Sequence, residues 1–204
     1  MNRLSIPRSA VPQVLALVAL VTVFVGASGV AAAPATAPAE TSSDSDAAFP
    51  KGAEFLTLYS GYQNERTGEA QFLATVTGGV GHYFLDNAAI ELQGVGYYAK
   101  DEEDGLGIGL NALARYHFIN VGRFSLYGDV LGGIFWTSQD FPTGGTEFNF
   151  TYAGGPGLSY KLADRVYLNG GLRFQHVSNG FIEGRDRNPI FNSFGGYVGL
   201  MWMR

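Results

Sequence analysis

Residues Leu106–Phe118 read LGIGLNALARYHF, and this stretch decides the fold class. Successive side chains of a β-strand point to opposite faces, so alternate residues share a face. One face is mixed and polar and includes Asn111, Arg115 and His117. The other face is apolar throughout, with Leu106, Ile108, Leu110, Ala112, Ala114, Tyr116 and Phe118. A membrane-spanning strand needs about 9–11 residues, so the stretch is long enough to cross a bilayer.

Seven further segments have strand character, and most exceed the about 5–6 residues of an ordinary globular strand. They are Phe55–Gln63, Ala70–Phe84, Ala88–Ala99, Arg123–Trp136, Thr146–Tyr160, Arg165–Ser178 and Ile190–Met203. A soluble ligand-binding barrel is the alternative, but it would place its apolar side chains inside. The pattern therefore predicts an all-β protein, an eight-stranded antiparallel transmembrane β-barrel.

The connections between these segments alternate between short and long. Short turns are expected at Leu85–Asn87, Ile119–Gly122 and Lys161–Asp164, and longer ones at Asn64–Glu69, Lys100–Gly105, Thr137–Gly145 and Asn179–Pro189. Outer-membrane barrels have short periplasmic turns and longer external loops. The sequence thus predicts that both chain ends lie on the periplasmic side and that Asn179–Pro189 is external.

The N-terminal part is typical of an exported protein. A positively charged start precedes the apolar run Val14–Val25, and small residues follow it, which predicts a signal peptide over residues 1–33. A membrane-anchoring helix is the alternative, but the run is shorter than the ~20 residues that a span needs. Residues 34–53 are rich in Ala, Pro and Ser and are expected to form a flexible linker. The barrel is expected to occupy residues 54–204.

Composition narrows the function classes. The chain has a net charge of −5, which argues against a nucleic-acid partner. It contains no cysteine, so disulfides and thiolate metal sites are excluded. The three histidines, His82, His117 and His176, fall on different strands without the spacing of a metal site. We expect neither a metal nor another cofactor.

Four charged residues, Glu91, Arg115, Asp129 and Arg173, fall on the inward faces of their strands. The interior of an eight-stranded barrel is filled by its own side chains, so charges there must be paired and hydrogen-bonded. We therefore expect a structural network of salt bridges inside the barrel. A transport path through these residues is the alternative.

A candidate site lies where the seventh strand ends. His176 and Ser178 continue the parity of the apolar face, so they should point out of the barrel near its external rim. If the last hairpin pairs symmetrically, Asn192 lies opposite His176. Asn192 would orient the imidazole while the imidazole activates Ser178, which is the nucleophile–base–orienter arrangement of a hydrolase. Alternatively, these polar residues only mark the aqueous rim.

The longer pattern is more specific. The stretches His176-Val-Ser178-Asn179-Gly180 and Arg187-Asn-Pro-Ile-Phe-Asn192-Ser193 resemble the C-terminal signature of the lipid A 3-O-deacylase family. The resemblance implies an outer-membrane barrel that hydrolyses an acyl ester of lipid A in lipopolysaccharide, with its triad on the barrel's outside among the membrane lipids. It makes Ser178 the nucleophile and His176 the general base.

The same resemblance assigns the remaining positions. The family's acidic triad member falls on Asn192, which is a departure, and Glu183 and Asp186 of the loop are other candidates for that role. Asn179 and Asn188 match polar positions of the motif and are expected, with Gly180, to contact substrate, Gly180 standing where the family usually has Ala. Whether the chain forms a homodimer is left open.

Two other functions stay open on the sequence alone. One is a catalytically silent outer-membrane barrel with a structural or lipid-binding role, which the amide of Asn192 favours. The other is a small adhesion or stability barrel whose acidic loop, Asp101–Asp104, binds cations or partners. For that loop we expect plain solvation.

Overall fold

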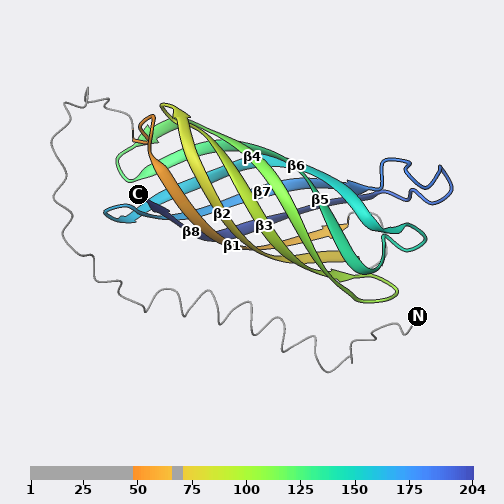
Figure 1. The fold of residues 1–204 in the computed structure, drawn as a ribbon. Coiled ribbons are helices and arrows are strands. Elements are labelled where there is room, and N and C mark those ends of the chain that lie inside the picture. Colours follow the sequence, from red (N-terminus) through yellow and green to blue (C-terminus); the bar gives the residue numbers. More distant parts are fainter. Residues whose placement is uncertain (1–47, 66–70) are drawn as a thin grey trace.

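A closed barrel of eight antiparallel strands forms the computed structural model, which describes residues 48–65 and 71–204. Each strand pairs with the next, and β8 closes onto β1 (Figure 1). The predicted fold class is confirmed. In the described part of the chain, no helix is long and apolar enough to cross a membrane. The strands are β1 (Glu54–Glu65), β2 (Phe72–Leu85), β3 (Ala88–Lys100), β4 (Gly105–Val121), β5 (Phe124–Phe141), β6 (Thr146–Ala163), β7 (Val166–Ser178) and β8 (Phe191–Met203).

Three predicted connections are largely strand. Residues 119–121 belong to β4 and residues 161–163 to β6, where the sequence suggested turns over Ile119–Gly122 and Lys161–Asp164. Residues 137–141 belong to β5, whereas the sequence suggested a connection over Thr137–Gly145. Phe141 is buried between the rings of Phe135 and Phe191, with centroids 6.2 and 5.0 Å away, so burial of this ring carries the strand outward. The Asn149 amide also donates to the carbonyl oxygen of Phe141 at 2.8 Å. Packing and this bond together outweigh the polar composition of the segment.

The outer surface of the barrel is apolar. Ile108 is 74% exposed, Val130 64% and Leu92 57%, and their neighbours on the same faces are exposed too. Soluble monomers rarely expose contiguous apolar patches beyond a few hundred Å². The inward faces bury polar side chains such as Asn111 and Ser159. The apolar-out, polar-in arrangement that the sequence predicts is therefore present.

A network of charges fills the middle of the barrel. Arg115 and Arg173 both reach the same carboxylate oxygen of Asp129, at 3.1 and 3.2 Å, and the Tyr197 hydroxyl donates to that oxygen at 2.6 Å. Arg115 also stacks over the Tyr127 ring, 3.9 Å from its centroid. Three of the four predicted interior charges thus form one paired cluster, as expected.

Glu91 is the exception among these four charges. Its buried carboxylate accepts hydrogen bonds from the Thr57 hydroxyl and, at 3.0 Å, from the Gln93 amide. Both hydrogen bonds reach the same oxygen, Oε1, and come from neutral groups rather than from the predicted ion pair, while the buried Oε2 accepts no hydrogen bond from the described residues.

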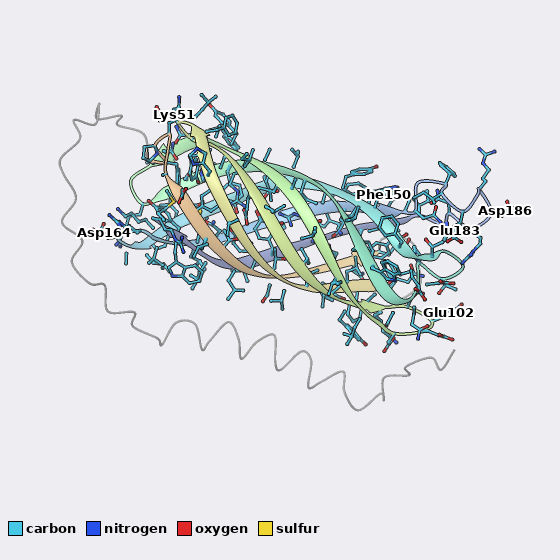
Figure 2. The ribbon with its side chains drawn as sticks, in the orientation of Figure 1. Lys51, Glu102, Phe150, Asp164, Glu183 and Asp186 are labelled. Atoms are coloured by element: carbon cyan, nitrogen blue, oxygen red, sulfur yellow. The ribbon has the colours of Figure 1, made fainter. Side chains whose placement is uncertain are left out.

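The two ends of the barrel differ. Lys51 and Asp164 lie at the end with the short turns, and Glu102, Glu183 and Asp186 lie at the end with the long loops (Figure 2). At the short-turn end Phe49 is buried, its ring 3.8 Å from that of His117, and its carbonyl oxygen accepts from the Asn87 N–H at 2.8 Å. Phe49, which belongs to the segment predicted as a linker, thus packs into the barrel mouth.

The acidic loop at the long-loop end is solvated only in part. Glu102 and Glu103 are exposed, as expected, but Asp101 and Asp104 are held by neighbouring groups. Asp101 is 7% exposed and accepts from the Gln71 amide at 2.8 Å and from the Thr143 N–H at 2.7 Å. Asp104 binds Lys100 at 2.6 Å. Asp101 therefore joins three neighbouring connections, which orders the rim of the barrel at this end.

Candidate active site

The last hairpin builds the candidate site. In the β7–β8 register His176 pairs with Asn192, as the sequence predicted, and in the β6–β7 register Ser178 pairs with Phe150. Phe150 is on the outer surface near the long-loop end (Figure 2). His176 and Ser178 are half-buried, and Asn192 is exposed. The three side chains therefore share the outward face of the barrel.

Their polar atoms are within hydrogen-bonding reach of one another. Asn192 Oδ1 lies 2.8 Å from His176 Nδ1, and Ser178 Oγ lies 3.3 Å from His176 Nε2. An amide oxygen can only accept, so the neutral imidazole carries its proton on Nδ1 and donates it to Asn192. Nε2 is then the lone-pair nitrogen, and it faces the Ser178 hydroxyl. The arrangement can take a proton from Ser178 as a nucleophile forms.

Tyr152 is a site residue that sequence reasoning missed. Its ring stacks on the His176 imidazole, with 4.6 Å between centroids and 21° between planes. Tyr152 is the partner of His176 in the β6–β7 register. Offset stacking of this kind restricts rotation of the imidazole. The signal that would have found Tyr152 is the strand register.

The two acidic candidates of the loop do not contact the imidazole. Glu183 is bound to the guanidinium of Arg187. Asp186 is exposed in the part of the loop that projects from the barrel (Figure 2). Within residues 48–65 and 71–204, the side-chain hydrogen-bond partners of His176 are Asn192 and Ser178. The amide of Asn192 thus stands where a triad has its acid.

The predicted substrate-binding residues Asn179, Gly180 and Asn188 lie in the loop that follows Ser178. Asn179 and Asn188 make hydrogen bonds within this loop. Asn179 is 2% exposed, and its side chain donates to the Arg187 carbonyl at 2.5 Å and accepts from the Phe181 N–H at 3.0 Å. Its own N–H donates to Asn188 Oδ1 at 2.9 Å. The Asn179 side chain is therefore directed into the loop. Gly180 is exposed, with φ +64°, a left-handed conformation that suits glycine.

The other histidines lie apart from this site. His82 is exposed on the outer face of β2. His117 lies inside the barrel, with Nδ1 2.7 Å from Ser125 Oγ and Nε2 3.1 Å from the Tyr83 hydroxyl. In the part of the chain that the structure describes, no three His, Cys, Asp or Glu side chains gather in a way that could hold a metal ion.

Comparisons with solved structures give distant likenesses. Neisserial surface protein A is similar at 16% identity over 74% of this chain and 94% of its own, with a TM-score of 0.49. The N-terminal β-barrel domain of Pseudomonas aeruginosa OprF is similar at 16% identity over 76% of this chain and 98% of its own, with a TM-score of 0.48. Neither likeness bears on activity. No curated protein matches the chain.

A comparison with protein families identifies the family of this chain, which the distant solved structures do not. Residues 70–201 match the family described as lipid A 3-O-deacylase (PagL). That range covers more than half of the chain and includes His176, Ser178 and Asn192. The apolar outer surface of the barrel agrees with a place in the outer membrane. The protein is a member of the lipid A 3-O-deacylase family, an outer-membrane β-barrel whose substrate class is lipid A.

Proposed function

We propose that the protein is a serine esterase that hydrolyses the 3-O-linked acyl ester of lipid A in lipopolysaccharide. The observation that carries this proposal is the outward-facing row Ser178–His176–Asn192, with contacts of 3.3 and 2.8 Å, inside the matched family region. Its place near the long-loop end supports the proposal. Lipid A lies in the outer leaflet, so a site at this level meets the ester without drawing the lipid out of the membrane.

The proposed reaction has two halves. Ser178 Oγ attacks the carbonyl carbon of the ester while His176 Nε2 takes the hydroxyl proton. The resulting tetrahedral intermediate collapses, the bond to the sugar oxygen breaks, and His176 returns the proton to that oxygen. Water then attacks the acyl-serine with His176 again as base. The products are a free fatty acid, a deacylated lipid A and a regenerated Ser178.

Asn192 has a positioning role in this proposal. Its amide oxygen holds the Nδ1–H tautomer, which leaves Nε2 free to act as base, as Asn does in Cys-His-Asn sites. An amide carries no charge, so it cannot stabilise the imidazolium that forms during attack as a carboxylate would. The oxyanion is proposed to bind to the Gly180 N–H and the Asn188 carboxamide, since both lie in the loop that begins beside Ser178.

The test is release of fatty acid from lipopolysaccharide by the purified protein in detergent. Ser178→Ala and His176→Ala are each expected to lower the rate by roughly 10³–10⁶-fold, as loss of a triad member does. Ser125→Ala is the matched control, because Ser125 also lies beside a histidine, but inside the barrel. Fatty-acid release that persists in both site variants would show that another group is the nucleophile.

Asn192 also favours a second candidate function, a catalytically silent barrel of the same family that binds lipid. The same assay separates the two candidates. A wild-type protein that binds lipopolysaccharide but releases no fatty acid is the silent barrel. Release that depends on Ser178 excludes it.

A further inference from the structure

The loop between β7 and β8 carries two apolar side chains that the proposed reaction does not use. Phe181 is 61% exposed and Ile182 is 63% exposed. The next residues are mostly charged and exposed, with Glu183, Arg185, Asp186 and Arg187 in the run. The loop is therefore divided into an apolar half next to Ser178 and a charged half beyond it.

The backbone of the apolar half is held in an unusual conformation. Phe181 has φ +65°, in the left-handed region that non-glycine residues rarely occupy. The Asn179 side chain fixes it by accepting from the Phe181 N–H at 3.0 Å, and the Phe181 carbonyl accepts from the Gly184 N–H at 3.0 Å. A phenylalanine in such a position, with most of its ring exposed, gains nothing evident from packing within the protein. Strain of this kind is found at sites where function requires it.

The apolar half begins on the lipid side of the rim. A Cβ atom on Gly180 would lie 3.1 Å from the ring of Phe150, which is an outward-facing residue of β6 and the register partner of Ser178. After Ser178 the chain therefore passes over the lipid-facing side of β6. Phe181 and Ile182 follow Gly180 directly in the chain.

The charged half is fastened to the rim. The Arg187 guanidinium donates to the Gly145 carbonyl oxygen at 2.9 Å, lies 3.7 Å from the carboxylate of Asp140 and binds Glu183. These contacts hold the second half of the loop against the connection between β5 and β6. A segment with one apolar and one charged half suits the boundary between acyl chains and headgroups.

We propose that Phe181 and Ile182 insert among the acyl chains of the outer leaflet and so hold the ester of the substrate at the depth of Ser178. The partner is the acyl layer of a lipid membrane, and the inference rests on the proposed function. The Phe150 contact favours lipid over a second copy of the chain, because Phe150 continues the apolar outer surface toward β5 through its exposed register partner Ile134.

A kinetic test compares two substrates. Phe181→Gly combined with Ile182→Ser is expected to lower kcat/KM toward lipopolysaccharide in vesicles by about tenfold or more, since two apolar anchors are lost. Hydrolysis of the soluble ester p-nitrophenyl butyrate should stay within about twofold of the wild type. Glycine accepts a positive φ at no cost, so the turn itself is retained. Leu162→Ser, an exposed apolar site near the short-turn end, is the matched control. Equal loss on both substrates, or no loss on either, overturns the proposal.

A second measurement reads insertion without catalysis. The chain has no cysteine, so Ile182→Cys can carry a single nitroxide label, with Asp186→Cys as the water-exposed reference. In vesicles of phosphatidylethanolamine and lipopolysaccharide, the label at 182 should collide with oxygen more than with a polar nickel chelate. A water-like label at 182, or spin–spin broadening that reveals a second copy, overturns the proposal. If the label at position 182 lies in lipid but the protein has no esterase activity, the proposed function is wrong and the insertion of the loop still holds.

Discussion

At the scale of single residues, Asn192 is the position where the proposed site lacks the charge of a triad acid. Its amide oxygen lies 2.8 Å from His176 Nδ1, so orientation is provided and charge is not. Asn192→Asp keeps the size of the side chain and adds a carboxylate that stabilises the imidazolium. We expect kcat/KM toward lipopolysaccharide to rise by roughly tenfold or more, since the acid of a triad serves both purposes.

Asn192→Ala is the companion variant. It removes the orienting contact and should lower the same rate constant by about tenfold or more. An alanine variant as active as the wild type would mean that Asn192 takes no part in orienting the imidazole.

The alternation of side chains along the strands predicts the positions of His176, Ser178 and Asn192 but not that of Tyr152. The alternation of β7 places His176 and Ser178 on one face, and a symmetric hairpin brings Asn192 opposite His176; both follow from counting residues. Tyr152 could not be found this way, because the β6–β7 register shifts between Lys161 and Ala163. A shift of one residue reverses which side chains share a face. The stacking partner of His176 therefore depends on an irregularity that the sequence does not reveal.

At the scale of elements, the strand lengths show the same limit. Thr137, Gln139 and Asp140 resemble loop residues, yet β5 continues to Phe141 through an irregular stretch of the β5–β6 ladder. The strand is extended by the burial of the Phe141 ring inside the barrel and by the hydrogen bond from the Asn149 amide, and the ring packs against Phe191, which is far away in the sequence. The segments that follow a simple alternation, such as β4 between Leu106 and Phe118, were readable from the sequence.

The fastening of the β7–β8 loop yields an element-scale prediction. Arg187→Ala removes the bond to the Gly145 carbonyl and the contacts with Asp140 and Glu183. Global stability should change by less than about 1 kcal/mol, since these ion pairs are half exposed. The amides of the loop should exchange with solvent faster, and lipopolysaccharide hydrolysis should fall several-fold. Hydrogen exchange resolved along the chain, together with the fatty-acid assay, measures both effects.

Arg187→Lys is the matched variant for this prediction. Lysine keeps the positive charge but lacks the planar guanidinium group, which reaches several acceptors at once. The loop amides of the lysine variant should therefore exchange nearly as fast as those of the alanine variant. Unchanged exchange of the loop amides in the alanine variant would contradict the fastening role.

At the scale of the whole molecule, stability depends on the charges inside the barrel. Asp129→Asn leaves Arg115 and Arg173 buried without their shared carboxylate. Breaking a buried ion pair by removing one partner costs about 3–5 kcal/mol, so the barrel should unfold at a lower urea concentration in detergent. Asp164→Asn is the control, because the side chain of Asp164 is 99% exposed in its pair with Lys161. Equal urea midpoints for the two variants would contradict the role of the network.

The architecture was more readable than the site. Eight long alternating segments joined by short and long connections predict a closed barrel, and a closed barrel of eight strands is the fold observed. The packing of Phe49 cannot be predicted from the sequence, because a single aromatic residue in an Ala-, Pro- and Ser-rich segment gives no pattern. Phe49 is held in the barrel mouth by contacts with the rings of Tyr83, His117 and Tyr167.

In the proposed reaction, the outward orientation of Ser178 and His176 has a kinetic consequence. A substrate for this site arrives by sideways diffusion within a two-dimensional film, and a released fatty acid stays in the same film. The rate is then governed by the mole fraction of substrate at the surface and not by its bulk concentration. Adding inert detergent to mixed micelles should slow the enzyme at constant total substrate, and accumulating fatty acid should compete for the same surface.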